Sequence, residues 1–186
     1  MYLFLGPSSP TKLEKNLIIY FWIPYGPSKV ALDTPKRWLE KKDPSGIMKK
    51  KYRLIDHTAD FGIHVYGSDS KELFANAAWA LFDTITEIDQ LSGLDSCHIE
   101  VSGDGWSDLM VNWLREVLYL WNGKELLVKK VRILSLSETE LAATAELDPF
   151  NPDRHVIKTE IKAVTYHQIQ VNSSPSGWEA MIIFDI

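Results

Sequence analysis

The sequence has a single cysteine, Cys97, among its 186 residues, so no disulfide can form within the chain. One thiol also excludes a zinc site built from several cysteines. Low cysteine usage is typical of proteins that work in the reducing cytosol, because thiols stay reduced there. We therefore expect a cytoplasmic protein.

Long hydrophobic runs are absent as well. The apolar stretch at residues 17–23 is far shorter than the roughly 20 apolar residues that a membrane-spanning helix needs. Pro24 follows this stretch and no small-residue cleavage site comes after it, so a secretory signal peptide does not fit. The sequence predicts a soluble protein with no membrane partner.

An excess of basic residues is also missing, since the formal net charge is −5. Residues 1–47 hold seven Lys and Arg against four Asp and Glu, whereas the remainder holds thirteen against twenty-one. An acidic body is a poor surface for binding nucleic-acid phosphates, which are bound mainly by Lys and Arg. If RNA is involved, we expect a protein partner to hold it, so that contact with RNA is only indirect.

The common catalytic motifs do not occur. The sequence has no Gly-rich phosphate loop, no G-x-S-x-G, no H-E-x-x-H and no EF-hand loop. The enzyme classes that depend on these motifs are therefore excluded.

Proline is concentrated at the start of the chain, where residues 1–47 contain six of the nine prolines. Proline at this density interrupts helices and sheet ladders, so we expect no long regular element there. We predict an N-terminal extension at 1–47 and one folded domain at 48–186. The extension is either a flexible tail or the product of a misplaced start, with Met48 the true initiator. A tail docked through Trp22 or Trp38 is the remaining alternative.

Regular patterns begin after Met48. Short strands are predicted at 52–55 and 61–66, and Asp69 with Glu72 is typical of a helix start. The helix that follows has apolar residues at spacings of three and four, which predicts one buried stripe. Its members are Phe74, Ala77, Ala78, Leu81, Phe82 and Ile85.

A second helix is predicted from about Ser107 to the Asn122-Gly123 pair, after a strand at 97–102. Its expected buried face consists of Met110, Trp113, Leu114, Val117 and Trp121. Further strands are predicted at 128–136, 140–147, 156–161, 163–171 and 178–186. Two helices and six or seven strands in mixed order indicate an α+β domain whose helices cover a largely antiparallel sheet. No internal repeat is apparent.

The residues that could carry chemistry include a cluster at 56–60. Asp56, His57, Thr58 and Asp60 lie within five residues between two predicted strands. Hard cations such as Ca²⁺ and Mg²⁺ need several oxygen ligands, which such a junction can present. The alternative is that Asp56 and Thr58 cap backbone N–H groups in a turn.

Two further segments hold candidate residues near the C-terminus. In the stretch 162–167 we expect Thr165 and His167 on one face of a strand, although a lone strand histidine is usually structural. The last strand ends with Asp185 and Ile186. Their carboxylates are either solvent-exposed beyond the sheet edge or additional oxygen ligands.

Together these motifs resemble the archease family. The similar segments are Asp-His-Thr-Ala-Asp at 56–60 with Phe-Gly-Ile after it, Glu-Ile-Lys-Ala-Val-Thr-Tyr-His at 160–167, and Ile-Ile-Phe-Asp-Ile at 182–186. The Pro-Asp-Arg-His loop and the helix around Trp113 are also similar. The resemblance covers about Lys50 to Ile186, and residues 1–47 match nothing in the family.

This resemblance implies a compact α+β archease fold, related in shape to the Hsp33 chaperone. It also implies a role as accessory protein of an RtcB-type tRNA-splicing RNA ligase, with no enzymatic activity of its own. Archeases are thought to promote guanylylation of the ligase histidine and so to allow multiple turnover.

The resemblance further implies a divalent-metal site, usually occupied by calcium. Carried over position by position, its ligands are Asp60, Asp185 and the terminal Ile186. Asp56, His57 and His167 also match motif positions, and we assign them a supporting role.

Two other functions remain open. A chaperone-like binding module would need a contiguous exposed apolar patch. A metal-dependent phosphoesterase would use Asp60 and Asp185 as ligands and His57 as general acid or base, and it would need an open cleft beside the metal.

Overall fold

The computed structural model describes residues 50–56 and 61–186. The predicted extension at 1–47 and its boundary at Met48 lie outside the described residues, so the division of the chain stays a prediction. The described elements, in chain order, are β1 (Tyr52–Asp56), β2 (Phe61–Gly67), α1 (Ser70–Ile85), the 3₁₀ turn η1 (Ile88–Gln90), β3 (Asp95–Ser102), α2 (Trp106–Asn122), β4 (Leu126–Leu136), β5 (Glu140–Pro149), β6 (Ala163–Val164), β7 (Gln170–Ser174) and β8 (Gly177–Asp185).

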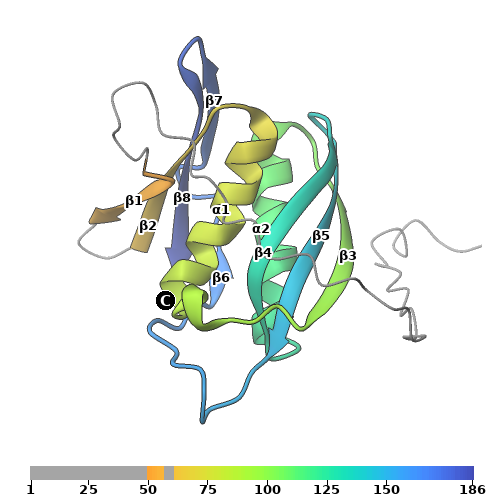
Figure 1. Ribbon diagram of the computed structural model, residues 1–186. Coiled ribbons are helices and arrows are strands. Elements are labelled where there is room, and N and C mark those ends of the chain that lie inside the picture. Colours follow the sequence, from red (N-terminus) through yellow and green to blue (C-terminus); the bar gives the residue numbers. More distant parts are fainter. Residues whose placement is uncertain (1–49, 57–60) are drawn as a thin grey trace, which may run out of the picture.

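The strands form two antiparallel sheets with the helices between them (Figure 1). One sheet has the order β1-β2-β8-β6, with β7 also paired to β8, and the other has the order β3-β5-β4. Helix α1 packs against β2 of the first sheet and β4 of the second, while α2 contacts β3, β4 and β6. The α+β class is confirmed, although two sheets rather than one enclose the helices.

Helix α1 begins where the sequence predicts. The Asp69 carboxylate accepts the Glu72 backbone N–H at 2.8 Å, which satisfies one of the free donors of the first turn. The Glu72 carboxylate in turn accepts the backbone N–H of Ser68 at 2.6 Å. In a standard capping box it would accept the N–H of the N-cap residue, Asp69, so here the return bond goes to the residue before the cap. All six residues of the predicted apolar stripe are fully buried.

Helix α2 supplies the centre of the core. Trp113 is fully buried, and its indole N–H donates to the Phe74 carbonyl oxygen of α1 at 3.0 Å. This bond ties the two helices together and satisfies the one polar atom of a large buried side chain. Trp121, predicted to be buried, is only partly so, because it packs edge-on against Phe150 near the surface.

A local repeat that the sequence analysis missed precedes each helix. Gly67 and Gly103 stand 36 residues apart, and a Cβ added to either would lie 2.4 or 2.5 Å from the backbone nitrogen of Leu73 or Leu109. Only glycine allows such a close approach of strand end and helix backbone.

Asn76 and Asn112 extend the correspondence. Each donates its side-chain amide to the carbonyl of the residue before that glycine, at 2.8 Å to Tyr66 and 3.0 Å to Ser102. The two β–α units are therefore built alike, on the shared pattern G-x₄-[DE]-L-x₂-N. The two units share only a glycine, an acidic residue, a leucine and an asparagine over ten positions, which is too few to be noticed as a repeat in the sequence.

Two of the predicted strands are wrong. Residues 156–161 form no strand, and only Ile157 makes an isolated bridge, to Thr86. The predicted strand 163–171 is reduced to the two residues of β6 and a separate β7. Along residues 156–161, backbone groups bond to helix residues instead of a neighbouring strand. The Lys158 N–H donates to the Ile85 carbonyl at 2.8 Å, and the Ile161 carbonyl accepts the Asn122 side-chain amide at 3.1 Å. Alternating apolar residues do not distinguish a strand paired in a sheet from an extended segment that packs on helices.

Among the described helices, none is long and apolar enough to cross a membrane.

Candidate functional site

Of the predicted metal ligands, Asp185 and Ile186 lie at one end of the first sheet. Asp56 is the last residue of β1, whereas His57 and Asp60 lie outside the described residues. Phe61, which follows Asp60 in the sequence, pairs across the ladder with Phe184, which precedes Asp185. The two phenyl rings stack with centroids 6.2 Å apart. The start of β2 and the end of β8 are therefore fixed side by side.

Asp185 and Ile186 are both exposed at this end of β8. The three residues before them, Ile182, Ile183 and Phe184, are all buried, and exposure begins where the ladder ends, at Asp185. Asp185 also pairs with Ala163 of β6. The Asp185 backbone is therefore held at a sheet end, next to β6.

Lys162 is brought to the same place, and the sequence analysis assigned it no role. Its backbone N–H donates to the Asp185 carbonyl at 2.8 Å, and its ammonium donates to the main-chain oxygen of Ile186 at 3.0 Å. The side chain is exposed. A positive charge thus lies beside Asp185 and the main-chain oxygen of Ile186. The only sequence feature that pointed to Lys162 was its position at the start of the stretch 162–167.

His167 is not brought to this group by any contact that the structure shows. It is exposed and lies beyond the end of β6, and its backbone N–H donates to the Thr165 hydroxyl at 3.2 Å. Gln168, the next residue, has φ 51°, so the chain turns here. The prediction that Thr165 and His167 share a strand face is therefore wrong.

Tyr166 and Asp108 form a hydrogen bond next to this turn, from the tyrosine hydroxyl to the carboxylate. This bond, together with the backbone N–H of Asp104, lowers the pKa of Asp108, and the same bond raises the pKa of Tyr166. The guanidinium carbon of Arg115 lies 4.7 Å from the Tyr166 ring centroid. The turn is therefore tied to α2 by polar contacts.

A hollow of about 380 Å³ lies near the start of α2. It is lined by Ser102, Gly103, Asp104, Asp108, Asn112, Thr139 and Glu140. Of the predicted site residues that the structure describes, none contributes to its lining. It therefore does not supply the cleft that the phosphoesterase hypothesis requires beside the metal.

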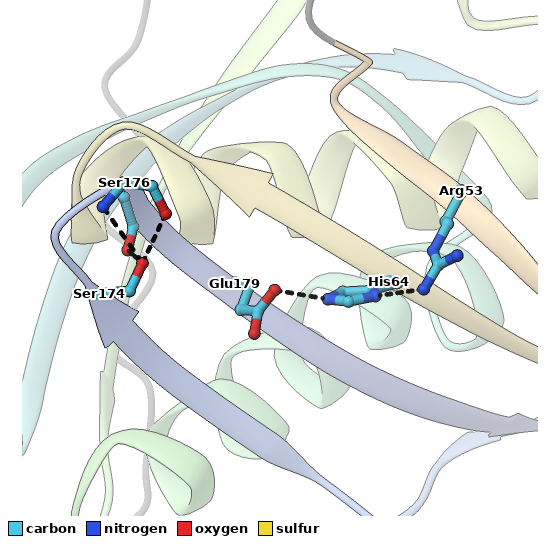
Figure 2. Close-up of polar contacts among 6 residues, drawn as sticks. Arg53, His64, Ser174, Ser176 and Glu179 are labelled. Atoms are coloured by element: carbon cyan, nitrogen blue, oxygen red, sulfur yellow. Dashed lines mark hydrogen bonds and ion pairs between the residues drawn. The ribbon is translucent and has the colours of Figure 1, made fainter.

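A second polar cluster lies on the outer face of the first sheet (Figure 2). His64 alternates with buried Ile63 and Val65, so it points away from the helices. Its Nε2 lies 3.0 Å from the Glu179 carboxylate and its Nδ1 lies 3.1 Å from the Arg53 guanidinium. Both ring nitrogens are occupied, so this histidine is not arranged as a free acid or base.

No group of three or more His, Cys, Asp or Glu side chains able to hold a metal occurs within residues 50–56 and 61–186. Asp60, one of the predicted ligands, is not in these ranges. The described part of the site offers the Asp185 carboxylate and the Ile186 main-chain oxygen, which already accepts an ammonium. These are oxygen donors, which fit a hard cation of the Ca²⁺ or Mg²⁺ type rather than a softer metal.

Comparison with known proteins gives matches over nearly all of the described residues. Archease from Methanosarcina acetivorans is 36% identical over 141 residues, which cover 74% of this chain and 97% of the relative. An archease-like protein of Drosophila melanogaster is 36% identical over 145 residues, covering 75% and 93% of the two chains. The relatives are thus matched along almost their whole length.

The fold is also found in a solved structure, the solution structure of Methanobacterium thermoautotrophicum protein 1598. The TM-score is 0.62 at 27% sequence identity, and the match covers 73% of this chain and 99% of the other. The model of the archease protein family matches residues 52–186, which include all the elements described above. The chain belongs to the archease family.

Proposed function

We propose that this protein is an accessory factor of an RtcB-type RNA ligase, and that it promotes guanylylation of the ligase active-site histidine. The observation that carries the proposal is membership of the archease family over residues 52–186. The described residues add a compatible feature. Asp185, the main-chain oxygen of Ile186 and Lys162 lie together at one sheet end.

The proposed working group consists of Asp60, Asp185, Ile186 and Lys162. Asp60, Asp185 and the Ile186 carboxylate would hold a divalent cation, calcium in the first instance, which supplies positive charge toward a nucleotide's phosphates. Support for including Asp60 comes from the pairing of Phe61 with Phe184, because the peptide bond keeps Asp60 next to Phe61. Asp56, His57 and His167 would play at most a supporting role.

Lys162 would add a second positive charge at the same place. Its ammonium donates to the Ile186 oxygen at 3.0 Å while its side chain stays exposed. An exposed lysine keeps donors for an incoming anion, because an ammonium has three. A protein whose body is acidic overall would thereby present a local site for phosphate oxygens.

Activation then requires differential binding. The accessory protein must bind the guanylylation-competent conformation of the ligase more tightly than the resting one, since equal binding would shift no population. A tenfold gain in the competent population corresponds to about 1.4 kcal/mol of binding preference. This is within reach of a single charge-assisted contact.

The direct experiment measures transfer of labelled GMP from GTP to the ligase, with and without this protein. Asp185→Asn and Lys162→Ala should each reduce the stimulated transfer at least tenfold while the circular dichroism spectrum stays that of the wild type. Asp153→Asn is the matched control, because Asp153 is an exposed aspartate in the loop after β5. Normal stimulation by the Asp185 and Lys162 variants would contradict the proposed site.

A further inference from the structure

The segment that carries Lys162 is held by a very short ladder. Strand β6 has only two residues, with Ala163 paired to Asp185 and Val164 to Phe184. Within the described sheet, β6 is an end strand, so its outer backbone groups have no strand partner. Such groups need other partners to stay ordered. In this segment, side chains of α2 supply the partners.

Three α2 side chains at seven-residue spacing meet this segment. They are Asp108, Arg115 and Asn122, and seven residues correspond to nearly two helical turns, so all three lie on one face. Asp108 accepts the Tyr166 hydroxyl, Arg115 Nε donates to the Val164 carbonyl at 3.2 Å, and Asn122 donates to the Ile161 and Lys162 carbonyls at 3.1 and 3.4 Å. The segment therefore runs antiparallel to α2.

The two partners have similar lengths. Fourteen residues of α-helix from Asp108 to Asn122 span about 21 Å. Five extended steps from residue 161 to 166 span about 16 Å. The long side chains of Arg115 and Tyr166 bridge the difference, and the guanidinium carbon lies 4.7 Å from the tyrosine ring centroid. The polar stripe of α2 thus contacts the segment over its whole length.

We propose that Asn122 and Arg115 are positioning residues for Lys162. They fix the outer edge of β6 so that the Lys162 ammonium meets the Ile186 oxygen. The inference has two parts: an anchoring half, that Asn122 and Arg115 hold the backbone around Lys162, and a functional half, that this anchoring matters for ligase activation. The functional half rests on the proposed role of Lys162. The anchoring half stands on the contacts alone.

The anchoring is separable from the stability of the whole domain. Ile161 and Val164 are fully buried, so apolar burial keeps the segment on the domain when a hydrogen bond is removed. Asn122 and Arg115 are exposed. Their loss should therefore loosen the backbone around Lys162 without unfolding the protein. A misplacement of about 1 Å at a working group is enough to reduce activity strongly.

The first test is amide hydrogen exchange followed by NMR. In Asn122→Asp, which keeps the side-chain shape but removes the donor, the Lys162 and Thr165 amides should exchange roughly 2- to 10-fold faster. Arg115→Met should act in the same direction. Asn76→Ala is the matched control, because Asn76 also donates from a helix to a strand carbonyl but at the far end of β2. It should leave the Lys162 and Thr165 amides unchanged.

The second test is a double-mutant comparison in the GMP-transfer assay. Asn122→Asp should reduce stimulation, and it should add no further loss in a Lys162→Ala background, since it acts through that lysine. A merely structural role would lower stimulation by the same factor in both backgrounds. Additive losses, or normal stimulation by Asn122→Asp, would overturn the functional half.

Unchanged exchange at Lys162 and Thr165 in both variants would overturn the anchoring half. If the wild-type protein fails to stimulate the ligase at all, the proposed function is wrong, and the functional half falls with it. The exchange measurement still decides whether α2 holds the segment. The two failures are therefore distinguishable.

Discussion

Asp148 shows how one buried carboxylate holds two segments together. Its side chain accepts the consecutive backbone N–H groups of Ser92, Gly93 and Leu94, the last two at 2.8 and 2.9 Å. Burial opposes its ionisation, but these donors outweigh burial and lower the pKa of Asp148 below its usual value. The loop before β3 is thereby attached to the end of β5.

A pH-dependent contribution to stability follows. The pKa of an unfolded aspartate is about 3.9. Because the folded value is lower, the contribution of Asp148 is complete above about pH 4 and is lost as the pH falls toward the folded value. Asp148→Asn should lower the free energy of unfolding at pH 7 by about 1–3 kcal/mol. The variant's free energy of unfolding should also fall less steeply than that of the wild type as the pH is lowered below about 4. Urea titrations from pH 3 to pH 7 measure both effects.

Asp95→Asn, at an exposed position on β3, is the control and should leave the curve nearly unchanged. An Asp148 variant with wild-type stability at pH 7 would show that the three N–H donors contribute nothing.

The proposed cation site makes a prediction at the same scale. A ligand that binds only the folded state stabilises it by mass action, by about 2.7 kcal/mol at a hundredfold excess over Kd. Adding Ca²⁺ should therefore raise the melting temperature of the wild-type protein. Asp185→Asn and Asp60→Asn should abolish the rise, because each removes one charged oxygen ligand.

Thermal melts with and without Ca²⁺ test this directly, and Asp153→Asn should keep the wild-type response. A Ca²⁺-induced rise of equal size in the Asp185 variant would place the ion elsewhere on the molecule.

At the scale of elements, the matching units around Gly67 and Gly103 are a structural requirement. A Cβ at either position would lie about 2.5 Å from a helix backbone nitrogen, which cannot move without shifting the helix. Gly103→Ala should therefore destabilise the protein by about 3 kcal/mol or more. Chemical denaturation measures the loss, and Asp104→Ala, at the exposed neighbouring position, should change stability by less than about 0.5 kcal/mol. A Gly103→Ala variant of wild-type stability would refute the close approach.

Elements with a strong local pattern were predictable from the sequence. The spacing of Phe74 to Ile85 and the Asp69 cap place α1 correctly, because both signals lie within a few residues of each other. The segment 156–166 was not predictable, since its partners are Ile85, Thr86 and Asn122, which are distant in the sequence. For the same reason, spacing alone did not identify Lys162. Its proposed role depends on a contact with Ile186 that the register of β6 on β8 creates.

At the scale of the whole molecule, the family match begins at residue 52, and the six prolines of the first 47 residues lie before it. We predict that a protein beginning at Met48 keeps its melting temperature within a few degrees of that of the full chain, because few buried contacts would be lost. Differential scanning calorimetry of both forms measures the difference. A large drop, or insolubility of the shorter form, would mean that Trp22 or Trp38 is docked on the domain.

The charge distribution bears on the role proposed for this protein. Residues 48–186 carry thirteen basic against twenty-one acidic residues, a balance that disfavours broad binding of RNA phosphates. The role proposed above needs no such surface, because in that proposal the ligase would hold the RNA. The protein would contribute only the local group around Asp185 and Lys162.

The most direct measurement of this account is the number of ligated RNA products per ligase molecule, with GTP and divalent metal in excess. With the wild-type protein present, the ratio should rise well above one, and without it the ratio should stay near one. The protein alone should form no product. A ratio that stays near one in its presence would contradict the account.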